Sequence, residues 1–264
     1  MTLLVHSQPG AGVVVDVTPA SAGWTYVGFR VVRLAAGQQY AGREPGRESC
    51  LVLLTGTADV MAGDLRYAAL GGRATVFSGP PTSVYVPASL DYTVTAVSDL
   101  ELAICTAPGT GTTSVRIIGP DEVGEETRGS GTNTRHVRNI LDDTSPAAES
   151  LLVVEVITPA GHWSSYPPHK HDRDAFPDET LLEETYYHRL SPPQGFAFQR
   201  VYTDDRSLDE TMAVGDGDVV LVPRGYHPVG AAHGYDLYYL NVMAGPRRAW
   251  RFANDPAHAW MLGK

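Results

Sequence analysis

Short apolar runs, interrupted at regular intervals by turn-forming residues, most limit what this chain of 264 residues can fold into. Between Val13 and Ala107 these runs are rich in Val, Ile, Leu, Tyr and Thr and are separated by Gly, Pro, Asp and Ser; examples are TYVGFRVVRL, SCLVLLTGTADV, RATVF, TSVYVPA, DYTVTAV and LELAICTA. No long stretch has the 3.6-residue periodicity of an amphipathic helix. Many short strands with turn signals between them predict an all-β barrel or sandwich.

The pattern of strands divides the chain into two β-rich regions. Residues 108–135 are polar and rich in Gly and Thr, with one short apolar strand at Val115 to Ile118. This composition is typical of a linker. A second β-rich region begins at Leu151 and ends near Met243. We therefore expect an N-terminal barrel at 1–107, a linker at 108–150, and a C-terminal barrel with its tail at 151–264.

The two regions have a weak internal repeat. In the second region Glu184 precedes Pro223 by 39 positions, and in the first region Glu48 precedes Pro87 by the same 39. Both acids enter an apolar strand, and both prolines close one. The regions therefore look like diverged copies of one barrel.

A candidate metal site lies in the second region. His169 and His171 flank one residue, so in an extended strand both imidazoles would point to the same face. Glu184 enters a β-prone run, and His227 follows a Pro-Arg-Gly turn. Imidazole and carboxylate together form a ligand set for divalent metals. These four residues predict a metal site, whereas the histidine pair alone is also compatible with an exposed polar loop.

Two details qualify this ligand set. Glu184 is preferred to Glu183 because it has the same strand parity as Tyr186 and sits deeper in the run. In the first region no His-x-His precedes Glu48, and Asp91 stands where the repeat would place the last histidine. We therefore expect one metal per chain and an N-terminal barrel that is degenerate and metal-free.

These motifs resemble those of known proteins. The His-x-His, the following Glu and the Pro-x-Gly-x-His turn resemble the half-motifs of the cupin barrel. The longer runs WSSYPPHKHD, LEETYYHR, GFAFQRVYTDDRSLDE, VPRGYHPV and GYDLYYLNVMAGP resemble the 5-deoxy-glucuronate isomerase family of inositol catabolism. The resemblance implies a bicupin, with two cupin-type β-barrels (jelly rolls) in tandem. It departs from the general cupin pattern in one respect, because twelve residues separate His171 from Glu184.

The resemblance also implies a reaction, the conversion of 5-deoxy-glucuronate to 5-dehydro-2-deoxy-gluconate. An open metal site holding Zn, Mn, Fe, Co or Ni suits this aldose–ketose isomerisation, in which a proton moves between neighbouring carbons through an enediol. The candidates for the catalytic base are Glu183, Asp172, Asp174 and Tyr202. Arg200 is the candidate for binding the substrate carboxylate, or alternatively pairs with Asp204 or Asp205.

Composition excludes several other classes. The formal net charge of −10 argues against a nucleic-acid partner. We find no signal peptide and no apolar run of the roughly 20 residues that span a bilayer, and the two cysteines lie in apolar runs. We expect a cytoplasmic enzyme acting on a small uronate, and a homo-oligomer is possible.

The rival functions are the 4-deoxy-5-hexosulose-uronate ketol-isomerase of pectin breakdown, a cupin dioxygenase and a sugar-binding cupin.

Overall fold

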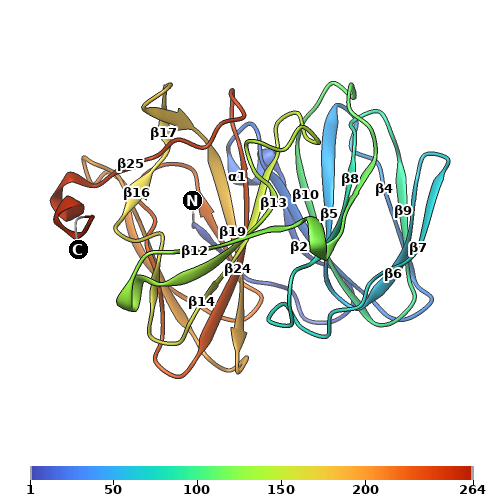
Figure 1. Ribbon diagram of the computed structural model, residues 1–264, viewed down its shortest axis with the longest axis horizontal. Coiled ribbons are helices and arrows are strands. Elements are labelled where there is room, and N and C mark those ends of the chain that lie inside the picture. The colour runs from blue at the N-terminus through green and yellow to red at the C-terminus, as the bar shows by residue number, and fades with distance from the viewer. Residues whose placement is uncertain (1, 263–264) are drawn as a thin grey trace. The chain divides into compact units, whose positions relative to one another are not determined.

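The computed structural model describes residues 2–262, and their architecture confirms the all-β prediction (Figure 1). Helical segments in this part of the chain are short: α1 at Pro19–Ala22 and the 3₁₀ helices η1 at Pro120–Glu122, η2 at Gly131–Asn133 and η3 at Pro256–Met261. None of the helices in residues 2–262 is long and apolar enough to cross a membrane. Sheets therefore position every site discussed below.

The described chain divides into two compact units. The N-terminal unit comprises residues 7–124 and 139–153, and the C-terminal unit comprises residues 2–6, 125–138 and 154–262. These boundaries differ from the expected ones, because the first residues belong to the C-terminal unit. The segment expected as a linker carries three strands: β11 (Arg116–Ile118), which agrees with the strand expected at Val115 to Ile118, and β12 (Gly124–Arg128) and β13 (Arg135–Leu141), which were not expected. The polar composition of β12 hid it, since a short strand at a sheet edge needs few apolar residues.

The N-terminal unit contains two antiparallel sheets. The first has the strand order β11 (Arg116–Ile118), β8 (Thr82–Val86), β5 (Arg47–Thr55), β10 (Leu100–Pro108), β3 (Gly28–Leu34) and β2 (Gly12–Val17). The second has the order β4 (Gln39–Gly42), β9 (Tyr92–Ala96), β6 (Thr57–Ala62) and β7 (Leu65–Gly71). Buried side chains from both sheets form one hydrophobic core, among them Leu51, Leu53, Val60, Val94 and Leu102. This is the packing of a two-layered β-barrel or sandwich.

Two further sheets contain most of the strands of the C-terminal unit. One has the order β1 (Leu4–Val5), β22 (Val219–Val222), β19 (Glu183–Ser191), β24 (Asp236–Ala244), β14 (Leu152–Thr158), β13 (Arg135–Leu141) and β12 (Gly124–Arg128). The other has the order β15 (Trp163–Ser164), β23 (Val229–Ala231), β20 (Ala197–Tyr202) and β21 (Asp209–Val214). Two small pairs complete it: β16 (His169–Lys170) with β25 (Ala253–Asn254), and β17 (Asp172–Ala175) with β18 (Glu179–Leu181).

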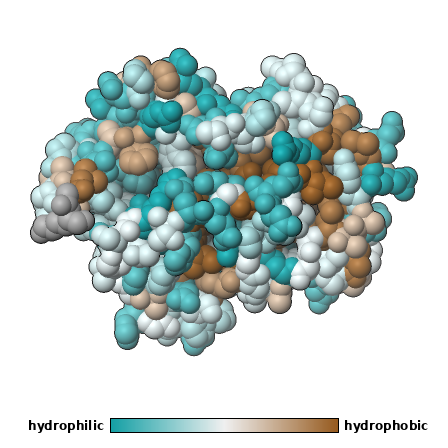
Figure 2. Space-filling view, viewed as in Figure 1, coloured by the Kyte–Doolittle hydropathy of each residue, from teal (hydrophilic) through white to brown (hydrophobic). Residues whose placement is uncertain are grey.

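Strands β19 and β24 form the centre of the large sheet. They pair in register from Glu183 opposite Ala244 to Ser191 opposite Asp236, and nearly all their side chains are buried. Continuous runs of β-branched and aromatic residues suit strands covered on both faces. Outside such strands the surface is more polar, and the face drawn in Figure 2 is mainly hydrophilic with smaller hydrophobic areas.

Candidate metal centre and adjoining cavity

Three histidines of the C-terminal unit come together in its interior. His169 lies in β16, His171 follows it, and His227 lies between β22 and β23. All three are buried, with at most 9% of each residue exposed, and their ligand atoms lie within 4.8 Å of one another. In residues 2–262 no other group of three or more His, Cys, Asp or Glu side chains meets this criterion.

Two of the imidazoles are oriented by backbone carbonyls. Nδ1 of His171 lies 3.1 Å from the carbonyl oxygen of Leu182, and Nδ1 of His227 lies 2.9 Å from that of Gly225. A carbonyl only accepts, so each Nδ1 carries the proton and each Nε2 presents a lone pair to the cluster. Metal-binding histidines are held in this way in proteins.

Glu184 meets the same two nitrogens. Its Oε2 lies 3.1 Å from Nε2 of His171 and 3.3 Å from Nε2 of His227. The register explains this, because Glu184 is opposite Val222 at the end of β22, just before the turn that carries His227. Lone pairs on nitrogen and on carboxylate oxygen attract one another only through a cation, either a proton or a metal ion. Nε2 of His227 has no hydrogen-bond partner in the described chain.

Electrostatics favour a metal ion over several protons. Burial lowers the pKa of His227 to about 4 and also lowers the pKa of His169 well below its ordinary value. Burial acts in the same direction on His171, but hydrogen bonding to Glu184 and its charge outweigh it and raise that pKa. At neutral pH the imidazoles of His169 and His227 are therefore neutral, and each can offer a nitrogen lone pair. This donor set fits a divalent cation.

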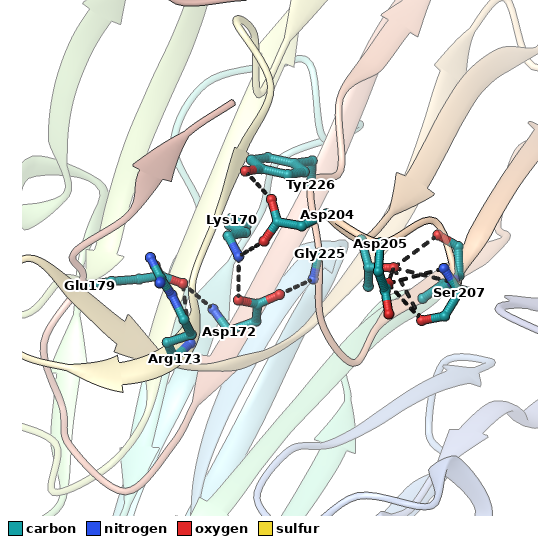
Figure 3. Close-up of polar contacts among 11 residues, drawn as sticks. Lys170, Asp172, Arg173, Glu179, Asp204, Asp205, Ser207, Gly225 and Tyr226 are labelled. Carbon is teal, nitrogen blue, oxygen red and sulfur yellow. Dashed lines mark hydrogen bonds and ion pairs between the residues drawn. The ribbon is translucent and has the colours of Figure 1, made fainter. Parts of the chain in front are cut away.

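Lys170, between the two histidines in the sequence, joins a second network, which Figure 3 shows. Its Nζ contacts Asp172 at 3.1 Å and Asp204 at 2.5 Å. The other oxygen of Asp172 accepts from the backbone N–H of Gly225 at 2.9 Å, and Asp204 accepts from the Tyr226 hydroxyl at 2.8 Å. The network ties the strand of His169 to the turn of His227. Both oxygens of Asp172 thus have partners in this network, which suits a residue that positions the histidines better than a catalytic base.

The other acids expected in the site also lie elsewhere. Asp174 is exposed on β17. Glu183 is buried beside Glu184 on β19, but successive side chains of a strand point to opposite faces, so the two acids diverge. The acidic insert between His171 and β19 forms the β17–β18 hairpin, in which Glu179 accepts from the backbone N–H groups of Asp172 and Arg173.

Arg200 and Tyr202 make their side-chain hydrogen bonds to acids outside the histidine cluster. Arg200 is on the exposed side of β20 and makes two 2.7 Å hydrogen bonds to Asp209, not to Asp204 or Asp205. Tyr202 is buried and donates to Asp255 at 2.7 Å. Strand alternation does not tell which face of a strand lines a cavity.

A small polar cavity of about 30 Å³ adjoins His169. Its polar lining includes Arg128, Arg135, Ser165, Tyr186, Tyr239 and Asn241. Of these, Tyr186 has the same strand parity as Glu184. Ser165 adopts φ +50°, which is uncommon for a residue other than glycine, and its hydroxyl lies 2.9 Å from that of Tyr186. The two arginines lie on β12 and β13, in the segment expected to be a linker.

The repeat position in the N-terminal unit has a different role. Glu48 is fully buried and accepts four hydrogen bonds, from the hydroxyl of Tyr85 and the backbone N–H groups of Glu149, Ser150 and Leu151. Asp91 is exposed and pairs with Arg43 at 3.4 Å. The counterpart of Glu184 therefore anchors a chain segment.

Proteins similar to this chain over almost its whole length are known. It is 58% identical to the 5-deoxy-glucuronate isomerase of Geobacillus kaustophilus over 97% of this chain and 93% of that protein. It is 52% identical to the 5-deoxy-glucuronate isomerase of Bacillus subtilis strain 168, over 96% and 94% of the two chains.

Two solved structures are also similar to this chain. An IolB-like protein from Salmonella typhimurium LT2 superimposes with a TM-score of 0.97 and 54% identity, covering 99% of this chain and 100% of that one. A mutant of Bacillus subtilis oxalate decarboxylase has a TM-score of 0.65 at 13% identity, covering 96% and 79%. This second likeness confirms the bicupin fold. The KduI/IolB family model matches residues 3–261, and the chain belongs to that family.

Proposed function

We infer that this chain is a 5-deoxy-glucuronate isomerase, converting that aldose to 5-dehydro-2-deoxy-gluconate. The observation that carries the inference is a buried cluster of three histidines and Glu184 beside a polar cavity, in a chain more than half identical to curated isomerases of this name. The substrate is a small sugar acid, and the cytoplasm is the compartment we propose. Two free, buried cysteines are compatible with a reducing environment.

We assign His169, His171, Glu184 and His227 as ligands of one divalent metal ion. When bound, such an ion supplies Lewis-acid chemistry, polarising a carbonyl and stabilising negative charge that develops beside it. The protein itself excludes water, because these ligands are almost completely buried. It also fixes the imidazoles through the carbonyls of Leu182 and Gly225.

The hydroxyls of Tyr186 and Tyr239 are assigned to orient substrate oxygens. Burial raises the pKa of both phenols, so they stay protonated at neutral pH and can donate. Ser165 contacts Tyr186, and Ser164 contacts Tyr239, which fixes the direction of each hydroxyl. Preorganised donors of this kind stabilise charge on a substrate oxygen.

No Asp or Glu lines the cavity in the described part of the chain. The base candidates from the sequence therefore have no support from their positions, and proton transfer through an enediol stays a prediction. Isomerisation in D₂O tests it. Deuterium at the migrating position of the product would support proton transfer, whereas a product without deuterium would favour a hydride shift.

The test of the function is a turnover assay on 5-deoxy-glucuronate, with protein stripped of metal by a chelator and then restored. We expect activity to disappear and return with the metal. Parallel assays separate the rivals: turnover of 4-deoxy-5-hexosulose uronate alone would indicate the pectin-pathway ketol-isomerase, and oxygen consumption a dioxygenase. Saturable sugar binding without turnover would indicate a binding protein and contradict the proposal.

A further inference from the structure

A sugar acid brings a negative charge into a protein whose own net charge is −10, so its carboxylate needs a local cation. Arg200, the expected candidate, is already paired with Asp209 and exposed. The cavity beside His169 instead contains two guanidinium groups, those of Arg128 and Arg135. Both come from the segment between the two barrels predicted from the sequence.

Arg135 is held in place without a counterion. Its Nη1 donates to the carbonyl oxygens of Asn133 at 3.1 Å and Tyr166 at 3.3 Å. Within residues 2–262 no carboxylate lies within ion-pair distance of it. By contrast Arg138, on the same strand, pairs with Glu125 and Glu155. Burial lowers the pKa of Arg135, which shows that its surroundings disfavour the charge. A half-buried guanidinium without an acid is costly unless a ligand supplies one.

Arg128 is partly neutralised and therefore secondary. It donates to Glu126 at 2.6 Å, and its guanidinium lies 5.0 Å from the ring centre of Trp250. The cavity thus has one free positive charge at Arg135 and one that is partly compensated. The rest of its polar lining, His169 included, is neutral at neutral pH, with the hydroxyls of Tyr186 and Tyr239 among the donors.

We propose that Arg135, assisted by Arg128, binds the carboxylate of the sugar acid and makes the enzyme select uronates over neutral sugars. The carbonyl end of the substrate would then face His169 and the carboxylate end the two arginines. A guanidinium matches a carboxylate with two parallel hydrogen bonds. The inference rests on the proposed isomerase function and deepens it. The cavity of about 30 Å³ is smaller than a sugar acid, so lining side chains move when substrate enters.

The experiment compares Arg135→Met with the wild type on two substrates. One is 5-deoxy-glucuronate, and the other is the same aldose with a hydroxymethyl group in place of the carboxylate. We expect Arg135→Met to lower kcat/KM for the acid by about 100-fold, mainly through KM, and to change kcat/KM for the neutral sugar by less than about threefold. Arg135→Lys keeps the charge but loses the planar fork, so it should fall between the two.

The matched control is Arg116→Met, which removes an exposed arginine paired with Glu122. It should leave both substrates unaffected. Metal content and the thermal unfolding temperature of each variant are measured beside the kinetics. An equal loss on acid and neutral sugar with normal folding would overturn the inference, as would unchanged kinetics in Arg135→Met.

Binding of D-glucuronate, measured by calorimetry, separates this inference from the proposed function. Suppose that the wild type does not isomerise 5-deoxy-glucuronate but binds D-glucuronate tightly, and that Arg135→Met binds D-glucuronate weakly. The carboxylate site is then supported and the isomerase function is contradicted. If the wild type isomerises 5-deoxy-glucuronate and both proteins bind D-glucuronate equally, the isomerase function is supported and the role of Arg135 is contradicted.

Discussion

Oε2 of Glu184 lies 3.1 Å from Nε2 of His171, although the other ring nitrogen, Nδ1, carries the proton and donates it in a hydrogen bond to the Leu182 carbonyl. The contact needs a cation, so loss of the carboxylate charge should weaken metal binding directly. We expect Glu184→Gln to hold far less than one metal per chain and to retain under a tenth of wild-type turnover, a cost above about 1.4 kcal/mol. Elemental analysis and turnover check this.

The control for Glu184→Gln is His136→Gln, which alters an exposed histidine that contacts Thr127. It should keep one metal equivalent and full turnover. Two equivalents per wild-type chain, both lost together with activity, would contradict assignment of a single site to the C-terminal unit.

Asp172 and Asp174 should respond very differently to loss of charge. Asp172→Asn weakens the link between Lys170 and the backbone of Gly225, and groups that orient metal ligands typically change affinity by about 10- to 100-fold. We expect weaker metal binding in competition with a chelator, with turnover recovering at excess metal. Asp174→Asn changes an exposed residue and should match the wild type. Turnover that stays low for Asp172→Asn at saturating metal would point back to a catalytic base.

Glu48 should matter for stability and not for metal. Its carboxylate accepts hydrogen bonds from three backbone N–H groups and one hydroxyl. In Glu48→Gln one of the two oxygens becomes an NH₂ group, which cannot accept a hydrogen bond from these donors. We expect a loss of about 2–4 kcal/mol in the free energy of unfolding of the N-terminal unit. Thermal unfolding checks this, with the exposed Glu122→Gln as control. Metal content should be unchanged, and an unaltered melting temperature would show that these hydrogen bonds contribute little.

Glu149 should make stability depend on pH. Partial burial alone would raise its pKa, but hydrogen bonds from Thr110 and Thr112 lower the pKa to about 2. A depressed carboxyl pKa stabilises the fold above the unfolded pKa of about 4.5, and this contribution is lost as the pH falls towards 2. Glu149→Gln should therefore be less stable than the wild type at pH 7 by about 1–2 kcal/mol.

Denaturant unfolding at pH 7 and pH 3 measures this difference. The gap between Glu149→Gln and the wild type should shrink at pH 3, because the wild-type carboxylate then contributes less. A gap that is the same at both pH values would show that the hydrogen bonds, and not the charge, carry the effect.

The sequence predicts the fold class and brings the right histidines together because both rest on local periodicity. His169 and His171 have the spacing of one strand face, and Glu184 has the parity of a buried strand. Arg135 could not be found in this way. Its segment is polar and rich in glycine, and it reaches the cavity only because β13 pairs with β14, a contact that local patterns do not encode. Arg200 was named as a binding candidate but is exposed, because strand alternation alone does not tell which face of a strand is in contact with solvent.

The hairpin between His171 and Glu184 closes on itself. The backbone N–H of Leu182 donates to the carbonyl oxygen of His171 at 2.9 Å, so the two ends of the insert meet beside the ligands whatever lies between them. The tip, with Asp174, Phe176 and Asp178, is exposed. The tip could therefore be shortened, or replaced by another peptide, without changing the positions of the metal-ligating side chains.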